Sequence, residues 1–188
     1  MTDLARMVDS LHRNIHGDAW HGPALLELIE GVTTAQATAK PIPGSHSIWE
    51  IVLHLTAWAT EVERRLRENP RQLPPERDWP TVDDNAPGAW PDAQKALIDS
   101  HERLRDSLKL FSAARLDVPV HAAGESMVPY SAMLHGVSQH IAYHGGQIAL
   151  LKNAQGPTDP DGPGQSGAPA TVSSISHRCR SSPPTEST

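Results

Sequence analysis

Apolar residues recur at intervals of three and four along most of the first 154 residues, and this spacing constrains the fold more than any other feature. It places apolar side chains on one face of an α-helix, whereas a half-buried strand needs strict alternation, of which no useful run is present. The spacing predicts four long helices, at 4–15, 48–68, 91–111 and 130–153. It also predicts a shorter segment, opened by Pro23, between the first and the second of them. Four amphipathic helices of this kind predict an all-α fold, a four-helix bundle.

Proline, glycine and capping residues indicate where these helices begin and end. The run from Pro41 to Gly44 predicts a turn. Ser47 and Glu50 form a capping-box pattern, in which each side chain bonds the other's free backbone N–H at the start of a helix. Residues 69–90 contain five prolines and are expected to form a long loop, a common form of active-site lid. Residues 117–129 are expected to form an irregular link.

The last part of the chain differs in composition from the rest. Residues 155–188 are rich in Pro, Gly, Ser and Thr and poor in apolar residues. Such a segment cannot bury enough surface to offset its ordering entropy, so a disordered tail is expected after a bundle domain at 1–154. Cys179, the single cysteine, lies in this tail, which rules out an internal disulfide or a four-cysteine zinc site. A reducing, cytoplasmic setting is expected.

Charge and hydropathy exclude further classes of protein. The formal net charge is −6, and nucleic-acid binders normally carry a basic patch. No apolar run approaches the roughly 18–20 residues of a membrane span. The first residues also lack the basic region and apolar stretch of a secretion signal. Neither nucleic acid nor a membrane is therefore an expected partner.

The chain holds eleven histidines, and three of them fall on predicted core faces. His140 and His144 are one helical turn apart on the last helix, and His54 shares the core face of the helix at 48–68. An unpaired buried polar group costs about 1–3 kcal/mol, and a divalent cation would satisfy three imidazole nitrogens at once. Three histidine ligands leave a coordination position open, as in catalytic zinc sites. The alternative is a set of hydrogen-bonded core histidines.

Other polar residues are candidates with two interpretations each. His101 lies on a core-facing stripe of apolar residues. It could be a competing metal ligand, but the preferred interpretation is a histidine packed in the core. His46 is expected either at the mouth of the site or as a helix cap. Gln147, close after His144, could orient a ligand. The pair Gly145–Gly146 is expected to allow close packing against another helix, with room for a ligand as the alternative. Three loop carboxylates are possible acid–base groups but are expected to be solvated, namely Asp78, Asp83 and Asp84.

Two segments carry a resemblance to a known family. Residues 46–58 read HSIWEIVLHLTAW, and residues 140–148 read HIAYHGGQI. In content, order and separation these segments resemble the DinB-like (YfiT-like) metalloproteins, over about residues 4–153. The resemblance implies an up-down-down-up four-helix bundle, often a homodimer, that holds a divalent metal, commonly nickel or zinc. It assigns the metal to His54, His140 and His144.

The resemblance leaves the reaction open. Some related proteins are transferases that use a low-molecular-weight thiol such as bacillithiol or mycothiol, and others are metal-dependent hydrolases. The preferred hypothesis is an enzyme whose metal activates such a thiol, or water, for attack on a small electrophile. The alternatives are a hydrolase, a non-enzymatic metal-binding stress-response module and a plain helical bundle. The catalytic residues are left unassigned, and a small-molecule substrate is expected.

Overall fold

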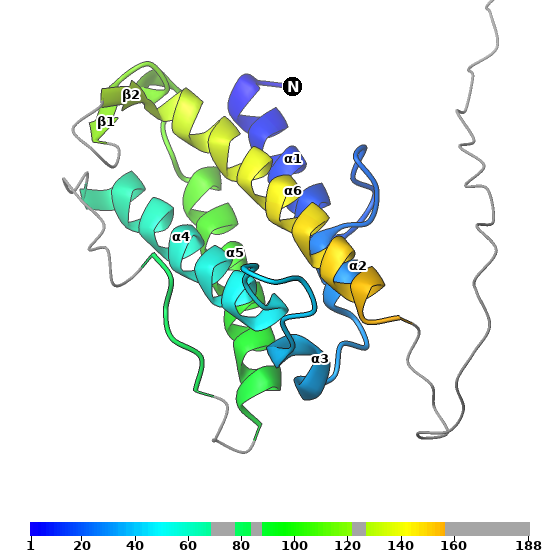
Figure 1. Cartoon of the computed structure of the whole chain (residues 1–188). Helices are drawn as coiled ribbons and strands as arrows, with labels where there is room; N and C mark the ends of the chain where they lie inside the picture. Colours follow the sequence, from blue (N-terminus) through cyan, green and yellow to red (C-terminus); the bar gives the residue numbers. More distant parts are fainter. Residues whose placement is uncertain (69–77, 84–87, 122–126, 157–188) are drawn as a thin grey trace, which may run out of the picture. The chain divides into compact units, whose positions relative to one another are not determined.

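The computed structural model of the chain describes residues 1–68, 78–83, 88–121 and 127–156. These residues are mostly helical, so the predicted all-α class is confirmed (Figure 1). The elements are, in chain order, α1 (Asp3–His16), α2 (Leu25–Ile29), α3 (Thr34–Thr38), α4 (Ile48–Glu68), α5 (Ala89–Lys109), a 3₁₀ turn (Ala113–Arg115), β1 (Pro119–His121), β2 (Met127–Pro129) and α6 (Tyr130–Ala154).

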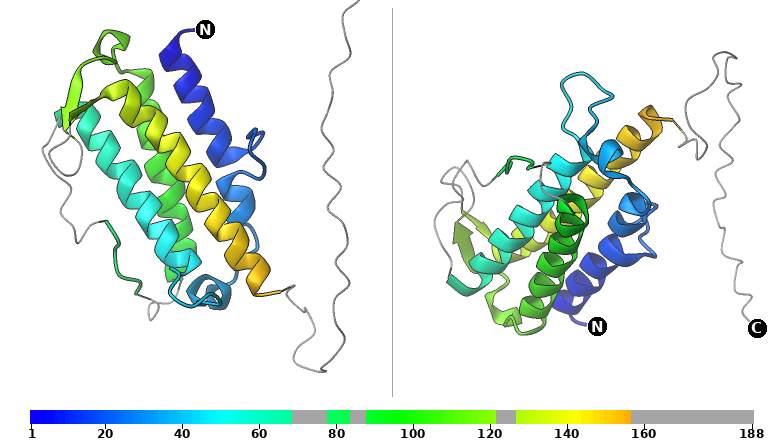
Figure 2. Two further views of the ribbon diagram at one scale, coloured as in Figure 1. Left: turned by 45° about the horizontal axis from the view of Figure 1, so that its top comes forward. Right: turned by 90° about the horizontal axis from the view of Figure 1, so that it is seen from below.

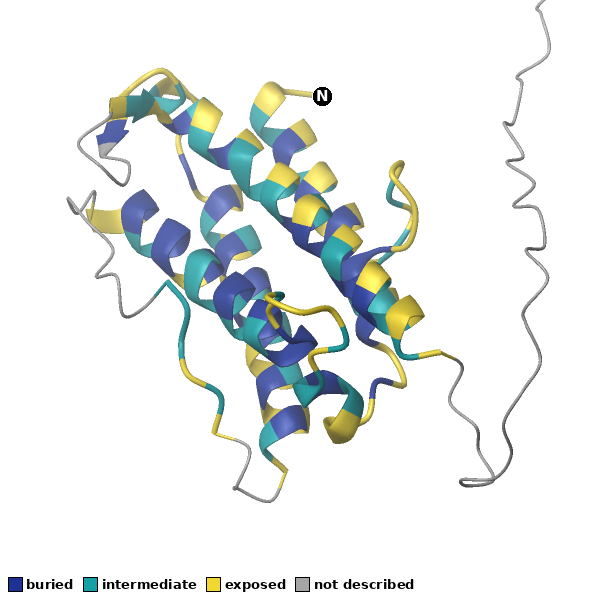
Figure 3. Ribbon diagram, viewed as in Figure 1, coloured by how far each residue is buried: buried dark blue, intermediate teal, exposed yellow. Residues whose placement is uncertain are grey.

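The four long helices pack against one another around a common core. α4 packs on α5 and α6, and α1 packs on the other sides of α5 and α6 (Figure 2). Each helix turns its buried residues inward and its exposed residues outward (Figure 3). The core contains residues from all four, among them Leu11, Ile51, Leu97, Leu104 and Ile148. The amphipathic spacing in the sequence therefore predicts the buried faces.

Local signals explain where the helices begin. The Ser47–Glu50 capping box is present: the Ser47 N–H donates to Glu50 Oε2 over 2.7 Å, and the Glu50 N–H donates to Ser47 Oγ over 3.2 Å. α5 begins at Ala89, two residues before the predicted start at Pro91. Pro91 lies in the first helical turn, where an N–H group would have no partner inside the helix. α6 begins at Tyr130, as predicted.

Two predictions differ from the structure. The segment opened by Pro23 is helical only over α2, which ends at Ile29, and a further short helix that was not predicted, α3, follows it. The predicted irregular link at 117–129 contains the antiparallel pair β1 and β2, with Val120 opposite Val128. Strands of three residues show a single alternation of side chains, too little to stand out in the sequence. β2 ends at Pro129 and leads directly into α6.

Part of the chain lies outside the described residues. This part comprises 69–77, 84–87, 122–126 and 157–188, and it includes Cys179 and all but the first two residues of the tail predicted at 155–188. The described residues of Met1–Pro157 form one compact unit. Among the described helices, none is long and apolar enough to cross a membrane.

Candidate metal centre

His54 is held on the inner face of α4. Ile51 and Leu55 are close to it on the same face of the helix, and both are 1% exposed. His54 itself is 5% exposed, so its imidazole points into the bundle, as its helical position predicts. The capping box at Ser47 begins this helix two turns earlier.

α6 supplies the other two histidines, one helical turn apart. His144 is 5% exposed and His140 is half-buried. α6 approaches α2 closely here, because a Cβ atom at Gly145 would lie 3.2 Å from Leu28 Cδ1. The predicted close packing is therefore confirmed for Gly145. Gly146 faces solvent, and a Cβ atom there would meet nothing within 4 Å.

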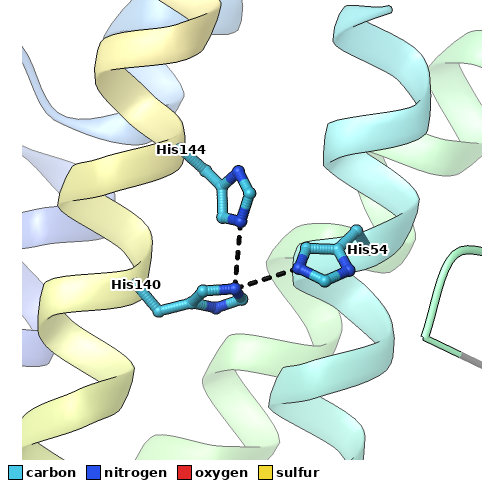
Figure 4. A group of neighbouring side chains, drawn as sticks. All are labelled: His54, His140 and His144. Carbon is cyan, nitrogen blue, oxygen red and sulfur yellow. Dashed lines mark hydrogen bonds between the residues drawn. The ribbon is translucent and has the colours of Figure 1, made fainter. Parts of the chain in front are cut away.

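The three imidazoles converge on one point between α4 and α6 (Figure 4). His140 Nε2 lies 3.0 Å from His54 Nε2 and 3.0 Å from His144 Nε2. The candidate ligand atoms of the three residues all lie within 4.8 Å of one another. Over the described part of the chain, this is the one group of His, Cys, Asp or Glu side chains close enough to hold a metal ion.

Oxygen acceptors hold the outer nitrogens of two of these rings. His54 Nδ1 donates to the backbone carbonyl of Asp78 over 2.6 Å. His144 Nδ1 donates to Gln147 Oε1 over 2.6 Å. Because both partners are carbonyl oxygens that only accept, Nδ1 carries the proton and Nε2 is left with its lone pair. Metal-ligating histidines normally have this arrangement, with the far nitrogen bound to an oxygen that fixes tautomer and ring orientation.

The model of the DinB superfamily matches residues 19–148, which is more than half of the chain and includes all three histidines. The chain belongs to the DinB superfamily. The resemblance carried by the two histidine segments is thereby confirmed. No curated protein and no solved structure matches the chain. The DinB superfamily is metal-binding, in agreement with a cluster of histidines that could hold an ion.

Of the described loop carboxylates in this DinB-superfamily chain, Asp78 is the one that lies at the cluster. Besides its carbonyl bond to His54, its carboxylate accepts a hydrogen bond from Trp58 Nε1 over 2.7 Å. Asp78 Oδ1 also lies 3.4 Å from His54 Nδ1. The expectation that Asp78 is merely solvated was therefore wrong. Asp83 is exposed, and Asp84 lies outside the described residues.

Trp79 is a neighbour of the cluster that sequence reasoning missed. Its indole stacks on His54 with ring centroids 3.9 Å apart, and on His46 with centroids 3.6 Å apart. The indole is thus sandwiched between a candidate ligand and a residue at the start of α4, which places His46 beside the site. The signal in the sequence was a tryptophan between an acid and a proline in a polar loop.

His101 lies near the cluster but is not part of it. It is 3% exposed on α5, and its Nδ1 donates to the Leu97 carbonyl over 2.8 Å. The preferred interpretation, a packed histidine, is confirmed. His135 lies exposed on α6, away from the core face that carries His140.

Burial keeps the imidazoles of this DinB-superfamily site neutral. Desolvation, and then the neighbouring His144 and His54, lower the pKa of His140 to about 4. Desolvation also lowers the pKa of His54 and of His144, although the bonds to Asp78 and Gln147 act in the opposite direction. The rings are therefore unprotonated near neutral pH, which is the form that binds metal.

The same burial predicts a loss of stability in acid for the metal-free protein. Burial lowers the pKa of His101 from 6.5 to about 4, so between these pH values the unfolded chain binds a proton that the folded chain does not. The free energy of unfolding should therefore fall as the pH drops from 6.5 to 4, by about 3 kcal/mol for this residue. Urea unfolding of chelator-treated protein across this range measures the effect.

A matched pair of variants isolates the histidine from the carboxylates that titrate in the same range. His101→Gln keeps a donor for the Leu97 carbonyl but has no titratable ring, so its stability should depend less steeply on pH. His135→Gln, at an exposed position, should keep the wild-type dependence. Equal slopes in the two variants would contradict the assignment.

Proposed function

We propose that His54, His140 and His144 bind a divalent cation, nickel or zinc, and that this centre activates a low-molecular-weight thiol, or water, to attack a small electrophile. The observation that carries the proposal is the convergence of three Nε2 atoms whose rings are neutral. Two of these rings are oriented from behind by oxygen acceptors. Hydrogen bonding alone leaves one of these contacts unexplained, because the Nε2 atoms of His54 and His144 can only accept and His140 Nε2 has at most one proton to donate.

The donor set fits such an ion. Nitrogen ligands lie about 2.0–2.1 Å from zinc, so two nitrogens on a tetrahedral ion are about 3.3 Å apart. The Nε2 separations of 3.0 Å are within a few tenths of an ångström of this value. Imidazole nitrogen suits both zinc and nickel, and three protein ligands leave a position open for a substrate.

The chain's own residues support attack by a thiol more than attack by water. A bound divalent ion would act as a Lewis acid that lowers the pKa of either group. The pKa of a free thiol is about 8.5 and needs only a small decrease to give the thiolate near neutral pH. The pKa of water is about 15.7, so attack by water gains more from a nearby general base that accepts its proton. Asp78 has the one carboxylate among the described residues at the site, and Trp58 Nε1 and His54 already engage it. A hydrolase remains the second candidate.

We propose for the chain the bundle topology that the superfamily resemblance implies. The packing of the four long helices, with α1 and α6 running one way and α4 and α5 the other, supports the up-down-down-up four-helix bundle (Figure 1). A homodimer in the cytoplasm stays a prediction, and size-exclusion chromatography with light scattering tests the dimer.

A turnover assay with and without thiol tests the reaction. The assay follows the consumption of a neutral electrophile such as monobromobimane in the presence of bacillithiol or mycothiol. The nickel- or zinc-loaded protein is expected to consume it at least a hundredfold faster than the same thiol does with the free metal. The His144→Ala variant should fall to the free-metal rate. Consumption that does not depend on thiol would favour the hydrolase, and no turnover with either nucleophile would favour a metal-binding module.

A further inference from the structure

A cavity of about 480 Å³ lies between α4 and α6, directly beside two histidines of the cluster. His54 and His140 form part of its wall, and His101 of α5 lines it as well. A volume of this size is typical of sites that enclose a small organic molecule. The cavity is thus placed to hold a molecule whose reacting group reaches the histidines.

The cavity is elongated because the lining residues follow both helices for about three turns. On α4 the lining extends from His54 to Arg65, which lies eleven positions further along the helix, or about 16 Å at 1.5 Å per residue. On α6 it extends from Ala132 to Ile141, and the two helices run in opposite directions (Figure 1). The histidines therefore lie at one end of the cavity and Arg65 at the other.

Small residues create the space, and apolar residues line it. A Cβ atom at Gly136, in the α6 wall, would meet nothing within 4 Å. Between the two ends the lining is mainly apolar, with Leu55, Ala59, Val62, Met133, Val137 and Ile141. An apolar molecule placed there would be removed from water along most of its length.

The two charged residues in the lining already have partners. Arg65 is 2% exposed, and its Nε donates to Glu61 Oε1 over 2.7 Å. The Asp78 carboxylate accepts from Trp58 Nε1. An ionised group on the body of a ligand would lose its hydration in this cavity and would have to compete with these bonds.

We infer that the substrate of this centre is a small uncharged molecule with an elongated apolar body, which lies in the cavity between α4 and α6 with its electrophilic end at His54 and His140. This inference names the substrate class for the proposed function and rests on it. Binding of the apolar body itself needs no metal, so the cavity and the metal site can be tested separately.

Two glycines of α6 provide a matched pair of variants. Gly136→Leu projects a side chain into the cavity, and Gly146→Leu projects the same side chain into solvent. Both substitutions replace a helical glycine with a strong helix former, so both should fold. Circular dichroism and the zinc affinity of each variant report whether the bundle and the metal site are intact. Ala132→Phe, in the exposed rim of the cavity, is a second blocking variant.

The fluorescence of N-phenyl-1-naphthylamine, a neutral apolar probe, measures occupation of the cavity in chelator-treated protein. The Kd of the probe should rise at least tenfold in Gly136→Leu and Ala132→Phe, and should change less than twofold in Gly146→Leu. Equal Kd values in all variants would overturn the inference, whatever the metal experiments show. Conversely, a protein that binds the probe but no metal would refute the proposed function and leave the cavity assignment standing.

The charge of the substrate is tested by displacement of the same probe. 1-Octanol should displace it at least tenfold more effectively than octanoate at pH 8, because the two differ mainly in the ionised group. Stronger displacement by octanoate would overturn the inference of an uncharged substrate and would indicate that Arg65 recognises a carboxylate.

Discussion

The His140→Ala variant is expected to lose at least a hundredfold in affinity for nickel and zinc. His140 is the central donor of the cluster, since its Nε2 lies 3.0 Å from the Nε2 atoms of both His54 and His144. At a metal concentration a hundred times Kd, binding should add about 2.7 kcal/mol to the free energy of unfolding of the wild type. For a domain of this size that raises Tm by about 5–10 °C, and the rise should vanish in the variant.

His135→Ala is the matched control for this experiment. It removes a histidine from the same helix, but the residue is exposed and lies outside the cluster. It should keep the affinity and the thermal shift of the wild type. A shift that survives in His140→Ala, or that disappears equally in both variants, would mean that the ion binds elsewhere.

The Gln147→Ala variant is expected to bind metal 10–100-fold more weakly while remaining folded. Gln147 Oε1 accepts the proton of His144 Nδ1 over 2.6 Å and thereby presents His144 Nε2 to the ion. Without this acceptor the ring can rotate or change tautomer, so part of the population no longer offers a lone pair. Isothermal titration with zinc measures the loss.

Two substitutions serve as controls for Gln147. Gln147→Glu keeps an acceptor at the same position and should keep or increase the affinity. Gln139→Ala removes an exposed glutamine elsewhere on α6 and should leave the affinity unchanged. An unchanged affinity in Gln147→Ala would show that packing alone orients His144.

The histidine cluster could be predicted from the sequence because its geometry is mostly local. His140 and His144 are one turn apart on one helix, and this spacing alone brings their imidazoles together. His54 lies on the buried face of α4, which the spacing of Ile51 and Leu55 also indicates. Only the pairing of α4 with α6 required more than helical periodicity, and the superfamily resemblance implied it.

The loop contacts could not be predicted in the same way. Asp78 accepts a hydrogen bond from His54 through its backbone carbonyl. Because every residue carries this group, no side-chain pattern in the sequence indicates the bond. Trp79 contacts His46 and His54 from a described segment outside any helix, and a contact of this kind has no periodic signal in the sequence. The cavity could not be predicted from the sequence either, since it depends on which small residues of α4 and α6 face each other.

The metal content of the untagged, full-length protein tests the central claim most directly. After purification without chelators, mass spectrometry of the elements should find about one equivalent of nickel or zinc per wild-type chain and almost none in His140→Ala. A wild-type protein that holds no divalent ion, and whose Tm does not rise when either ion is added, would contradict the account.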